Sequence, residues 1–404
     1  MNKNKIFKGK IDINSKGETT IISEHIEHKI FLNKHSLRYF HNDEVEFFIN
    51  KRKRKGKYLA TVEKLINREK KSYVGTIQIN ENFAFAILDG KKINVDMFIP
   101  KENISNAQDG DKVVVEILTW RKNDMSPTGK VIEILGKPGD HETEIHTIIK
   151  THELPLEFPR EVEEYAKKIS KQISKNEIEK RRDIRETLTF TIDPEDAKDF
   201  DDAISFKEID KEIYEIGVHI ADVGHYVERN SILDKEAFNR ATSIYLVDRV
   251  VPMLPEILSN MVCSLRPQEE KYTFSAIFKI NNKGELLEEW FGKTVIKSDR
   301  RFSYEEAQEI IETKKGKISK EIALNNKSYE VRREMVNAIV ILNEIALTVR
   351  EERKKQGSIN FNKKEIKFKL DSLKNPIEVV FKENKEANKL IEEFMLLANK
   401  KVAE

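Results

Sequence analysis

Six carboxylate side chains are crowded into ten residues near the middle of the chain. Apolar, strand-like segments flank them at 188–192 and 203–206. Unit charges about 4 Å apart repel by roughly 1 kcal/mol in water and several-fold more near a protein surface. A loop held between two packed strands cannot spread these charges, but a hard divalent cation removes the conflict, and oxygen ligands select Mg²⁺ or Mn²⁺ over zinc. The candidates are Asp193, Glu195, Asp196, Asp199, Asp201 and Asp202.

A metal site of this kind suits phosphodiester hydrolysis, because a bound cation polarises the phosphoryl oxygen, activates the attacking water and stabilises the leaving oxygen. Residue types alone leave two other interpretations open, namely a calcium-binding loop and a solvated acidic turn. The helix–loop–helix calcium pattern does not fit the positions, and the flanking segments are typical of strands.

The elements around this loop mix strands and helices. One or two linker helices are predicted within 160–183, and Ser303-Tyr-Glu-Glu is typical of a capping box that opens another helix. Apolar spacing predicts a long amphipathic helix over 331–349 that stops before Gly357, and a last helix over about 386–401. The sequence therefore predicts a mixed α/β domain.

The first part of the chain has short alternating segments separated by Gly, Asn and Asp, and their order occurs twice. The segments 42–49 and 56–66 correspond to 110–117 and 129–135. Two tandem all-β barrels of the OB-fold type explain this repeat. The expected domains are a first barrel over 1–66, a second barrel over 67–138, a helical linker over 139–184 and the α/β domain over 185–404.

Two features of the barrels could contact a nucleic acid. Phe83 and Phe85 lie on one face of a predicted strand, where they either stack on bases or fill the barrel core. The basic run 51–57 contains Arg52, Lys53 and Arg54 and is predicted to be a hairpin tip that contacts phosphates, although alone it would be a solvated turn. Residues 1–60 carry 14 Lys and Arg against 7 Asp and Glu, which agrees with a polyanion-binding front.

Composition excludes several classes of protein. The chain has 72 basic and 70 acidic residues and a single cysteine, Cys263, so no internal disulfide can form and nothing indicates an oxidising compartment. There is no run of about 18 apolar residues and no apolar stretch of signal-peptide length at the start. We expect a cytoplasmic protein that is a monomer without a membrane or disulfide partner.

The carboxylate segment also resembles the signature of the ribonuclease II / ribonuclease R family, the RNB-domain exoribonucleases, and is closest to ribonuclease R. The resemblance extends in the family's order to the last predicted helix, and the upstream barrels match the family's tandem cold-shock domains. The motifs that carry it are Ile192-Asp-Pro-Glu-Asp-Ala-Lys-Asp-Phe-Asp-Asp-Ala, Gly217-Val-His-Ile-Ala-Asp-Val, Ala241-Thr-Ser-Ile-Tyr-Leu-Val-Asp, Pro252-Met-Leu-Pro, Leu258-Ser-Asn-Met-Val-Cys-Ser-Leu, Gly357-Ser-Ile-Asn-Phe and Leu390-Ile-Glu-Glu-Phe-Met-Leu-Leu-Ala-Asn.

The resemblance implies processive 3′→5′ hydrolysis of single-stranded RNA to nucleoside 5′-monophosphates with Mg²⁺. It also assigns the site residues. The four essential aspartates correspond to Asp193, Asp199, Asp201 and Asp202. The residues implied to contact RNA are Tyr245 and Phe361, which clamp the terminal nucleotide, Tyr304, and Glu393 at the terminal ribose.

Glu393 has an argument of its own. At 100° per residue it falls on the apolar side of the last helix, whereas Glu392 points toward solvent. A buried carboxylate without a partner is costly, which favours a functional role for Glu393, with Glu392 as the alternative. His219 in an alternating strand and Cys263 without a nearby base are both interpreted as structural.

The chain departs from the family at both ends. It begins directly at the first barrel, and the family's catalytic domain continues beyond the position of Glu404 with an arginine that assists phosphate chemistry and a basic S1-type barrel. The sequence thus predicts a C-terminally incomplete RNB domain. The alternatives to a metal-dependent exoribonuclease are an RNA-binding protein with an inert catalytic domain and a structural cation-binding protein.

Overall fold

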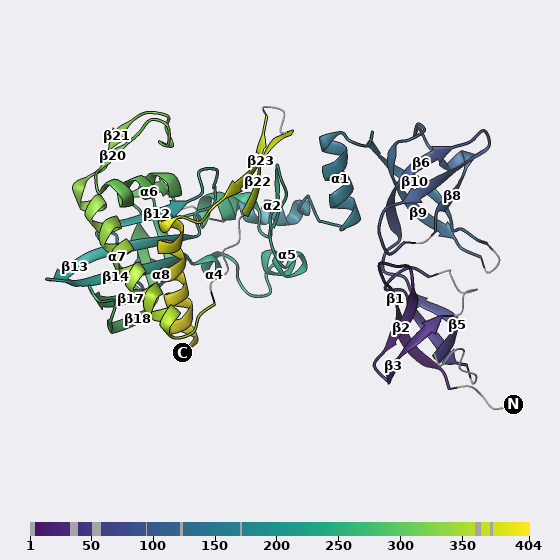
Figure 1. Ribbon diagram of the computed structural model, residues 1–404, viewed down its shortest axis with the longest axis horizontal. Coiled ribbons are helices and arrows are strands. Elements are labelled where there is room, and N and C mark those ends of the chain that lie inside the picture. Colours follow the sequence, from purple (N-terminus) through teal and green to yellow (C-terminus); the bar gives the residue numbers. More distant parts are fainter. Residues whose placement is uncertain are drawn as a thin grey trace. The chain divides into compact units, whose positions relative to one another are not determined.

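The computed structural model describes residues 5–32, 39–50, 58–93, 95–121, 124–169, 172–359, 365–371 and 375–404. The chain forms two compact units, residues 1–156 and 157–404 (Figure 1). None of the described helices is long and apolar enough to cross a membrane.

The first unit begins with a closed five-stranded barrel in the order β1-β2-β3-β5-β4. Alternating apolar residues point inward, with Ile11, Val45 and Phe47 fully buried in the centre, so the period-two pattern of the sequence builds this core. The strands are β1 Phe7–Ile13, β2 Thr19–Ser23, β3 Ile26–Leu32, β4 Glu44–Ile49 and β5 Tyr58–Asn67.

A second closed barrel follows in the order β10-β8-β7-β6-β9, which confirms the tandem barrels predicted from the internal repeat. Gly129 allows β9 and β10 to approach, because a Cβ at this position would lie only 2.7 Å from the Glu116 carbonyl oxygen. The elements are β6 Ser72–Ile79, β7 Phe83–Leu88, β8 Met97–Pro100, η1 Lys101–Asn103, β9 Lys112–Thr119, β10 Thr128–Gly136 and the helix α1 His141–Thr151.

The second unit is built on a seven-stranded sheet in the order β11-β18-β17-β14-β13-β12-β19. Neighbours are antiparallel except for β11 beside β18 and β12 beside β19, which are parallel. The strands are β11 Arg182–Asp183, β12 Thr189–Asp193, β13 Asp202–Asp210, β14 Ile213–Ala221, β17 Glu270–Asn281, β18 Leu286–Lys297 and β19 Arg300–Ser303.

Three helices cover one face of this sheet, and their buried residues form one core with Phe190, Ile216 and Phe278 (Figure 1). They are α6 Tyr304–Thr313, α7 Arg333–Lys355 and α8 Glu386–Ala403. The predicted capping box is present, since Ser303 Oγ accepts from the Glu306 N–H and the Glu306 carboxylate accepts from the Ser303 N–H. The mixed α/β architecture and the two predicted long helices are confirmed.

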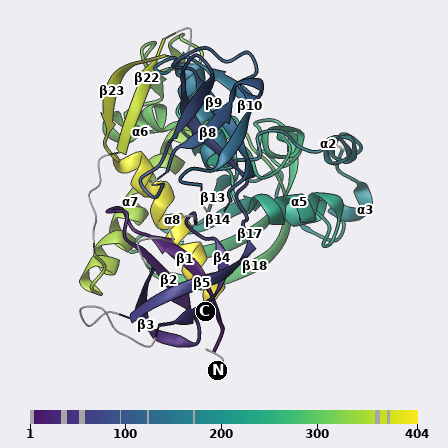
Figure 2. The same cartoon turned by 90° about the vertical axis from the view of Figure 1, so that its right-hand side faces the viewer.

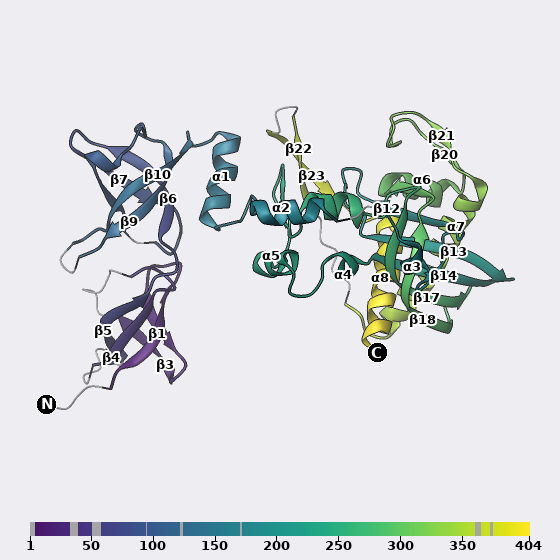
Figure 3. The ribbon, with the colours of Figure 1, turned by 180° about the vertical axis from the view of Figure 1, so that it is seen from behind.

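Shorter elements form a second core with Ile277 and Ile296 of the sheet. Helices α2 and α5 pack against each other in this core (Figure 3). The elements of this core are α2 Arg160–Lys167, α4 Val223–Tyr226, α5 Ile232–Arg240 and the π-helical turn η2 Ile257–Val262. The short helix α3 Lys175–Ile178 follows α2 in the chain and has no buried residue.

The remaining strands form small two-stranded sheets, and the β22–β23 hairpin leads directly into α8 (Figure 2). Ile366, Phe368, Val379 and Phe381 share one exposed face of this hairpin. These strands are β15 Ile244–Tyr245, β16 Val250–Val251, β20 Lys317–Ile318, β21 Tyr329–Glu330, β22 Glu365–Leu370 and β23 Pro376–Lys382.

Candidate active site

The acidic loop, residues 193–202, joins two adjacent strands of the seven-stranded sheet. Asp193 is the last residue of β12 and Asp202 is the first residue of β13. The strands pair through Phe190 and Ile204, whose side chains are buried in the core beneath the helices. The apolar flanks recognised in the sequence therefore bring both ends of the loop to one end of the sheet.

Hydrogen bonds from neighbouring segments fix the second half of the loop. The Phe200 N–H donates to Ser264 Oγ at 3.0 Å, and the Leu265 N–H donates to the Phe200 carbonyl oxygen at 2.8 Å. The Ala221 N–H at the end of β14 donates to the Asp201 carbonyl oxygen at 3.0 Å. The sequence motif around 258–265 is thus used to hold the acidic loop.

Burial and repulsion disfavour the charged forms of Asp193, Asp201 and Asp202. Burial raises the pKa of Asp193 to about 7, with further contributions from Asp202 and Asp199, against which Thr191 and Arg301 act. Burial and Asp201 together raise the pKa of Asp202 to about 6. The pKa of Asp201 is also raised, by burial and by Asp199, although this residue retains exposed surface.

The donor chemistry of the loop fits a hard divalent cation. Asp193 Oδ2 is buried and has no hydrogen-bond partner among the residues that the structure describes, and a cation would supply the positive charge that the raised pKa values show to be missing. In the part of the chain that the structure describes, no three His, Cys, Asp or Glu side chains are gathered closely enough to hold a metal ion as they stand. The carboxylates have the chemical type and the charge that such an ion requires, but three of them do not converge on one point in the described residues.

Two of the predicted aromatic residues lie at this loop. The Tyr245 hydroxyl donates to Asp199 Oδ2 at 3.3 Å, while 67% of the residue is exposed. Burial, followed by Asp202 and Asp193, raises the pKa of Tyr304 to about 12, so its phenol stays protonated at neutral pH. The third predicted aromatic, Phe361, lies outside the described residues.

Glu393 is buried on the apolar side of α8, with 3% of the residue exposed, as the helical spacing predicts, and Glu392 is exposed. Its carboxylate has a partner, because Arg353 of α7 donates to both oxygens at 3.1 and 2.6 Å. A contact to RNA through Glu393 stays a prediction, and it would require this ion pair to open or to be shared.

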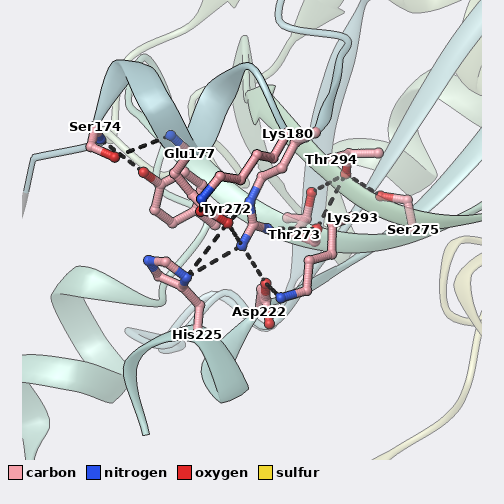
Figure 4. Close-up of polar contacts among 11 residues, drawn as sticks. Ser174, Glu177, Lys180, Asp222, His225, Tyr272, Thr273, Ser275, Lys293 and Thr294 are labelled. Carbon is pink, nitrogen blue, oxygen red and sulfur yellow. Dashed lines mark hydrogen bonds and ion pairs between the residues drawn. The ribbon is translucent and has the colours of Figure 1, made fainter. Parts of the chain in front are cut away.

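A cluster of contacts around the buried Arg181 was missed from the sequence, and Figure 4 shows its partners Glu177, Asp222 and Tyr272. The side chain of Arg181 has no exposed surface and forms ion pairs with Glu177 at 2.9 Å and Asp222 at 2.8 Å. Its guanidinium lies 4.3 Å from the centre of the Tyr272 ring. Asp222 directly follows the residue that binds the Asp201 carbonyl, so the cluster supports the end of β14 at the site.

His219 is structural, as predicted. It is fully buried, and its Nδ1 lies 2.7 Å from Ser275 Oγ. Burial lowers its pKa to about 3, so the ring is neutral in the folded protein. Cys263 is buried as well, and burial raises the pKa of its thiol to about 12, which agrees with an unreactive side chain.

On the second barrel, Phe83 and Phe85 lie outside the core, so the interpretation that they fill it is wrong. The alternation of β7 turns Ala84 and Ala86 inward instead. Phe98 of β8 completes a surface group of three rings whose centroids are 5.6–5.8 Å apart. The alternation of Met97 and Ile99 could have revealed Phe98 from the sequence. Arg52, Lys53 and Arg54 lie outside the described residues.

Comparison with known proteins agrees with this architecture. The RNB domain family model matches residues 181–404, more than half of the chain, and the cold shock domain model matches residues 85–159. Ribonuclease R of Thermotoga maritima is 38% identical over 347 residues, which cover 85% of this chain and 47% of that relative. DIS3-like exonuclease 2 of Schizosaccharomyces pombe is 42% identical over 72% of this chain and 31% of that relative.

Solved structures have the same fold. Mycoplasma genitalium RNase R in complex with ribose-methylated single-stranded RNA superposes with a TM-score of 0.86 at 27% identity, over 98% of this chain and 61% of that one. Yeast Ssd1, a pseudonuclease, has a TM-score of 0.60 at 17% identity over 87% of this chain and 48% of that one, and this likeness shows the fold alone.

The fold and the acidic loop together define a protein with cold-shock barrels followed by an RNB domain. The chain belongs to the RNB-domain family, and within it the chain is a homologue of ribonuclease R. It spans about half the length of the curated relatives that it matches.

Proposed function

We propose that this chain carries the nucleic-acid-binding and metal-binding parts of a 3′→5′ exoribonuclease that hydrolyses single-stranded RNA to nucleoside 5′-monophosphates. The observation that carries the proposal is the placement of Asp193, Asp199, Asp201 and Asp202 in one loop at the end of β12 and β13, where burial and repulsion would be relieved by a bound cation without protonation of the carboxylates. Homology to ribonuclease R supports it.

Asp193, Asp199, Asp201 and Asp202 are the proposed ligands of Mg²⁺, or of Mn²⁺ in its place. Such an ion would polarise the phosphoryl group and lower the pKa of the attacking water. Asp201 retains exposed surface, and we place it nearest the reacting phosphate. The carboxylates on either side of it keep the loop anionic, so that the loop binds a cation rather than the phosphate itself.

The aromatic residues are proposed to hold the RNA end. Tyr245 presents an exposed ring beside Asp199, where a base can stack, as Phe361 is predicted to do from the opposite side. The protonated phenol of Tyr304 can donate a hydrogen bond to a phosphate or sugar oxygen near Asp202. These roles assign the RNA end to the same end of the sheet as the acidic loop.

The barrels are proposed to bind the body of the RNA strand. The rings of Phe83, Phe85 and Phe98 supply a stacking surface on the second barrel, and the basic tip at Arg52, Lys53 and Arg54 is predicted to contact phosphates on the first. The proposed division is barrels over 1–66 and 67–138, a linker over 139–184 and a catalytic domain over 185–404, acting as a monomer.

A second candidate function is RNA binding without catalysis. It is favoured by one observation, the surface rings on the second barrel, which need no metal to act. Metal dependence separates the two functions, because stacking and phosphate contacts form without a divalent cation.

The test is to incubate the chain with 5′-labelled single-stranded RNA, with Mg²⁺ and with EDTA, and to resolve the products on a denaturing gel. We expect Mg²⁺-dependent shortening to a small end product. Asp201→Asn should lower turnover by roughly 10³-fold or more, since it removes charge where the transition state is stabilised, and should change RNA affinity only a few-fold. Binding without shortening would assign the chain to the second function.

A further inference from the structure

Arg301 touches the acidic loop near both of its ends. Its Nη2 donates to the Pro194 carbonyl oxygen at 2.7 Å and to the Glu195 carbonyl oxygen at 2.8 Å, just after Asp193. The same guanidinium lies 4.8 Å from the centre of the Phe200 ring, which separates Asp199 from Asp201. One side chain on the neighbouring strand β19 therefore contacts the loop both at residues 194–195 and at Phe200.

The strand that carries Arg301 is well placed to act as a fixed support. β19 pairs in parallel with β12, with Arg301 opposite Thr191 and Ser303 opposite Asp193. Phe302, between them, is fully buried in the core beneath α6, α7 and α8. Since alternate residues of a strand face opposite sides, the core locks the strand from one side while Arg301 reaches the loop from the other.

The loop needs such a support because its charges repel one another. Glu195 and Asp196 add to the four proposed ligands, and both side chains are exposed. Without an attachment near Pro194 the first turn of the loop would be free to move outward. A guanidinium suits this task, because one rigid planar group bonds to the carbonyl oxygens while its face lies on an aromatic ring, whereas a lysine ammonium is a point charge without such a plane.

We propose that Arg301 is a positioning residue that fixes the backbone of the loop 194–200 and thereby sets the aspartates for cation binding. Its Nη2 bonds to two carbonyl oxygens of the loop, so this nitrogen is held by the loop backbone. The effect on the cation rests on the proposed function, whereas the effect on the loop backbone does not.

The chain offers a matched control in the adjacent residue. Arg300 is on the same strand, but its guanidinium lies 4.2 Å from the centre of the Tyr329 ring, away from the loop. Arg300→Lys and Arg301→Lys keep the charge and remove the same fork. A role that depends only on positive charge predicts no effect for either variant, and a positioning role predicts an effect for Arg301→Lys alone.

The test is hydrogen–deuterium exchange of the metal-free full chain, read on peptides that cover 194–201, together with Mn²⁺ binding followed by electron paramagnetic resonance. Arg301→Lys should speed exchange of the loop amides by about tenfold or more, while Arg300→Lys stays within about twofold. Mn²⁺ affinity should fall roughly 10- to 100-fold for Arg301→Lys, the usual cost of losing a group that orients metal ligands.

Each outcome has a distinct meaning. Loop exchange in Arg301→Lys equal to that of the unmodified chain overturns the proposal. Faster exchange together with no Mn²⁺ binding by the unmodified chain supports the positioning role and overturns the metal site of the proposed function. If Arg301→Lys does not fold, the second variant is Phe200→Leu, which keeps an apolar side chain but removes the ring. It should still speed hydrogen exchange of the loop by a few-fold, and unchanged exchange in this variant would contradict the proposal.

Discussion

Asp193 lies at the end of a buried strand, and burial is the main reason why its pKa is about 7. A carboxyl whose pKa is higher in the folded state than its ordinary value of 3.8 binds more protons when folded. The free energy of unfolding therefore falls as the pH rises from about 4 to about 7. In the absence of a cation, the residue proposed to bind metal destabilises the fold at neutral pH.

Asp193→Asn should accordingly stabilise the metal-free chain. At pH 8 in EDTA we expect a gain on the order of 2–4 kcal/mol in the free energy of unfolding, shrinking to little below pH 4. Denaturant unfolding of both chains across this range measures the difference. His219, with its pKa lowered to about 3 by burial, adds an opposite pH dependence, but this contribution is common to both chains and cancels.

Two comparisons sharpen this result. Asp196→Asn, an exposed position in the same loop, should change the free energy of unfolding by less than about 0.5 kcal/mol. Saturating Mg²⁺ should stabilise the unmodified chain more than Asp193→Asn, because only the former keeps the full ligand set. Equal stability of the two chains at pH 8 in EDTA would mean that the carboxylate at 193 is not in conflict with its surroundings.

Among the elements, the end of β14 depends on an ion-pair cluster that spans distant parts of the chain. Arg181 precedes β11, whereas Asp222 follows β14 and Tyr272 belongs to β17. Burial raises the pKa of Glu177 and the hydrogen bond and charge of Arg181 lower it, and the net shift is downward. The Glu177 carboxylate therefore stays charged beside the buried guanidinium, which also forms an ion pair with Asp222.

Arg181→Met should be costly, because it leaves Glu177 and Asp222 without their buried partner. We expect a loss of about 3–5 kcal/mol in the free energy of unfolding, measured by urea denaturation. The control is Arg160→Met, since Arg160 also pairs with a glutamate but its side chain is 90% exposed, and a loss below about 0.5 kcal/mol is expected. Similar losses for both variants would show that the cluster does not support β14.

The contrast between local and distant signals explains how much the sequence could predict. The acidic loop, the capping box at Ser303, the apolar stripe of α7 and the repeated barrel strands all depend on neighbouring residues, and each was predicted. The Arg181 cluster was not predicted. Arg181 donates to the carbonyl oxygen of Thr273, which is 92 positions away in the sequence, and no spacing rule links two such residues. The partner of Glu393 was missed for the same reason.

For the whole molecule, the two units have separate proposed tasks, and the fold alone does not decide whether both are performed. A pseudonuclease has the fold of this chain, so each task needs its own measurement. The barrel unit has its own core and its own surface group of rings, and neither depends on the acidic loop. Variants of one unit should therefore leave the chemistry of the other unchanged.

Phe98→Ala is the variant that tests this separation. Its ring contacts both Phe83 and Phe85 in the surface group, and stacking on a base is worth about 1–3 kcal/mol. Affinity of the full chain for a fluorescent single-stranded RNA in EDTA, measured by anisotropy, should thus fall roughly 5- to 150-fold.

The control variant is Leu118→Ala, on β9 of the same barrel with 45% of the residue exposed, and it should change the RNA affinity little. At saturating RNA the rate of cleavage should be the same in all three chains, because the substitution weakens binding by the barrel unit and leaves the unit that carries the aspartates unchanged. A lower saturated rate in Phe98→Ala alone would show instead that the barrel takes part in presenting RNA to the acidic loop.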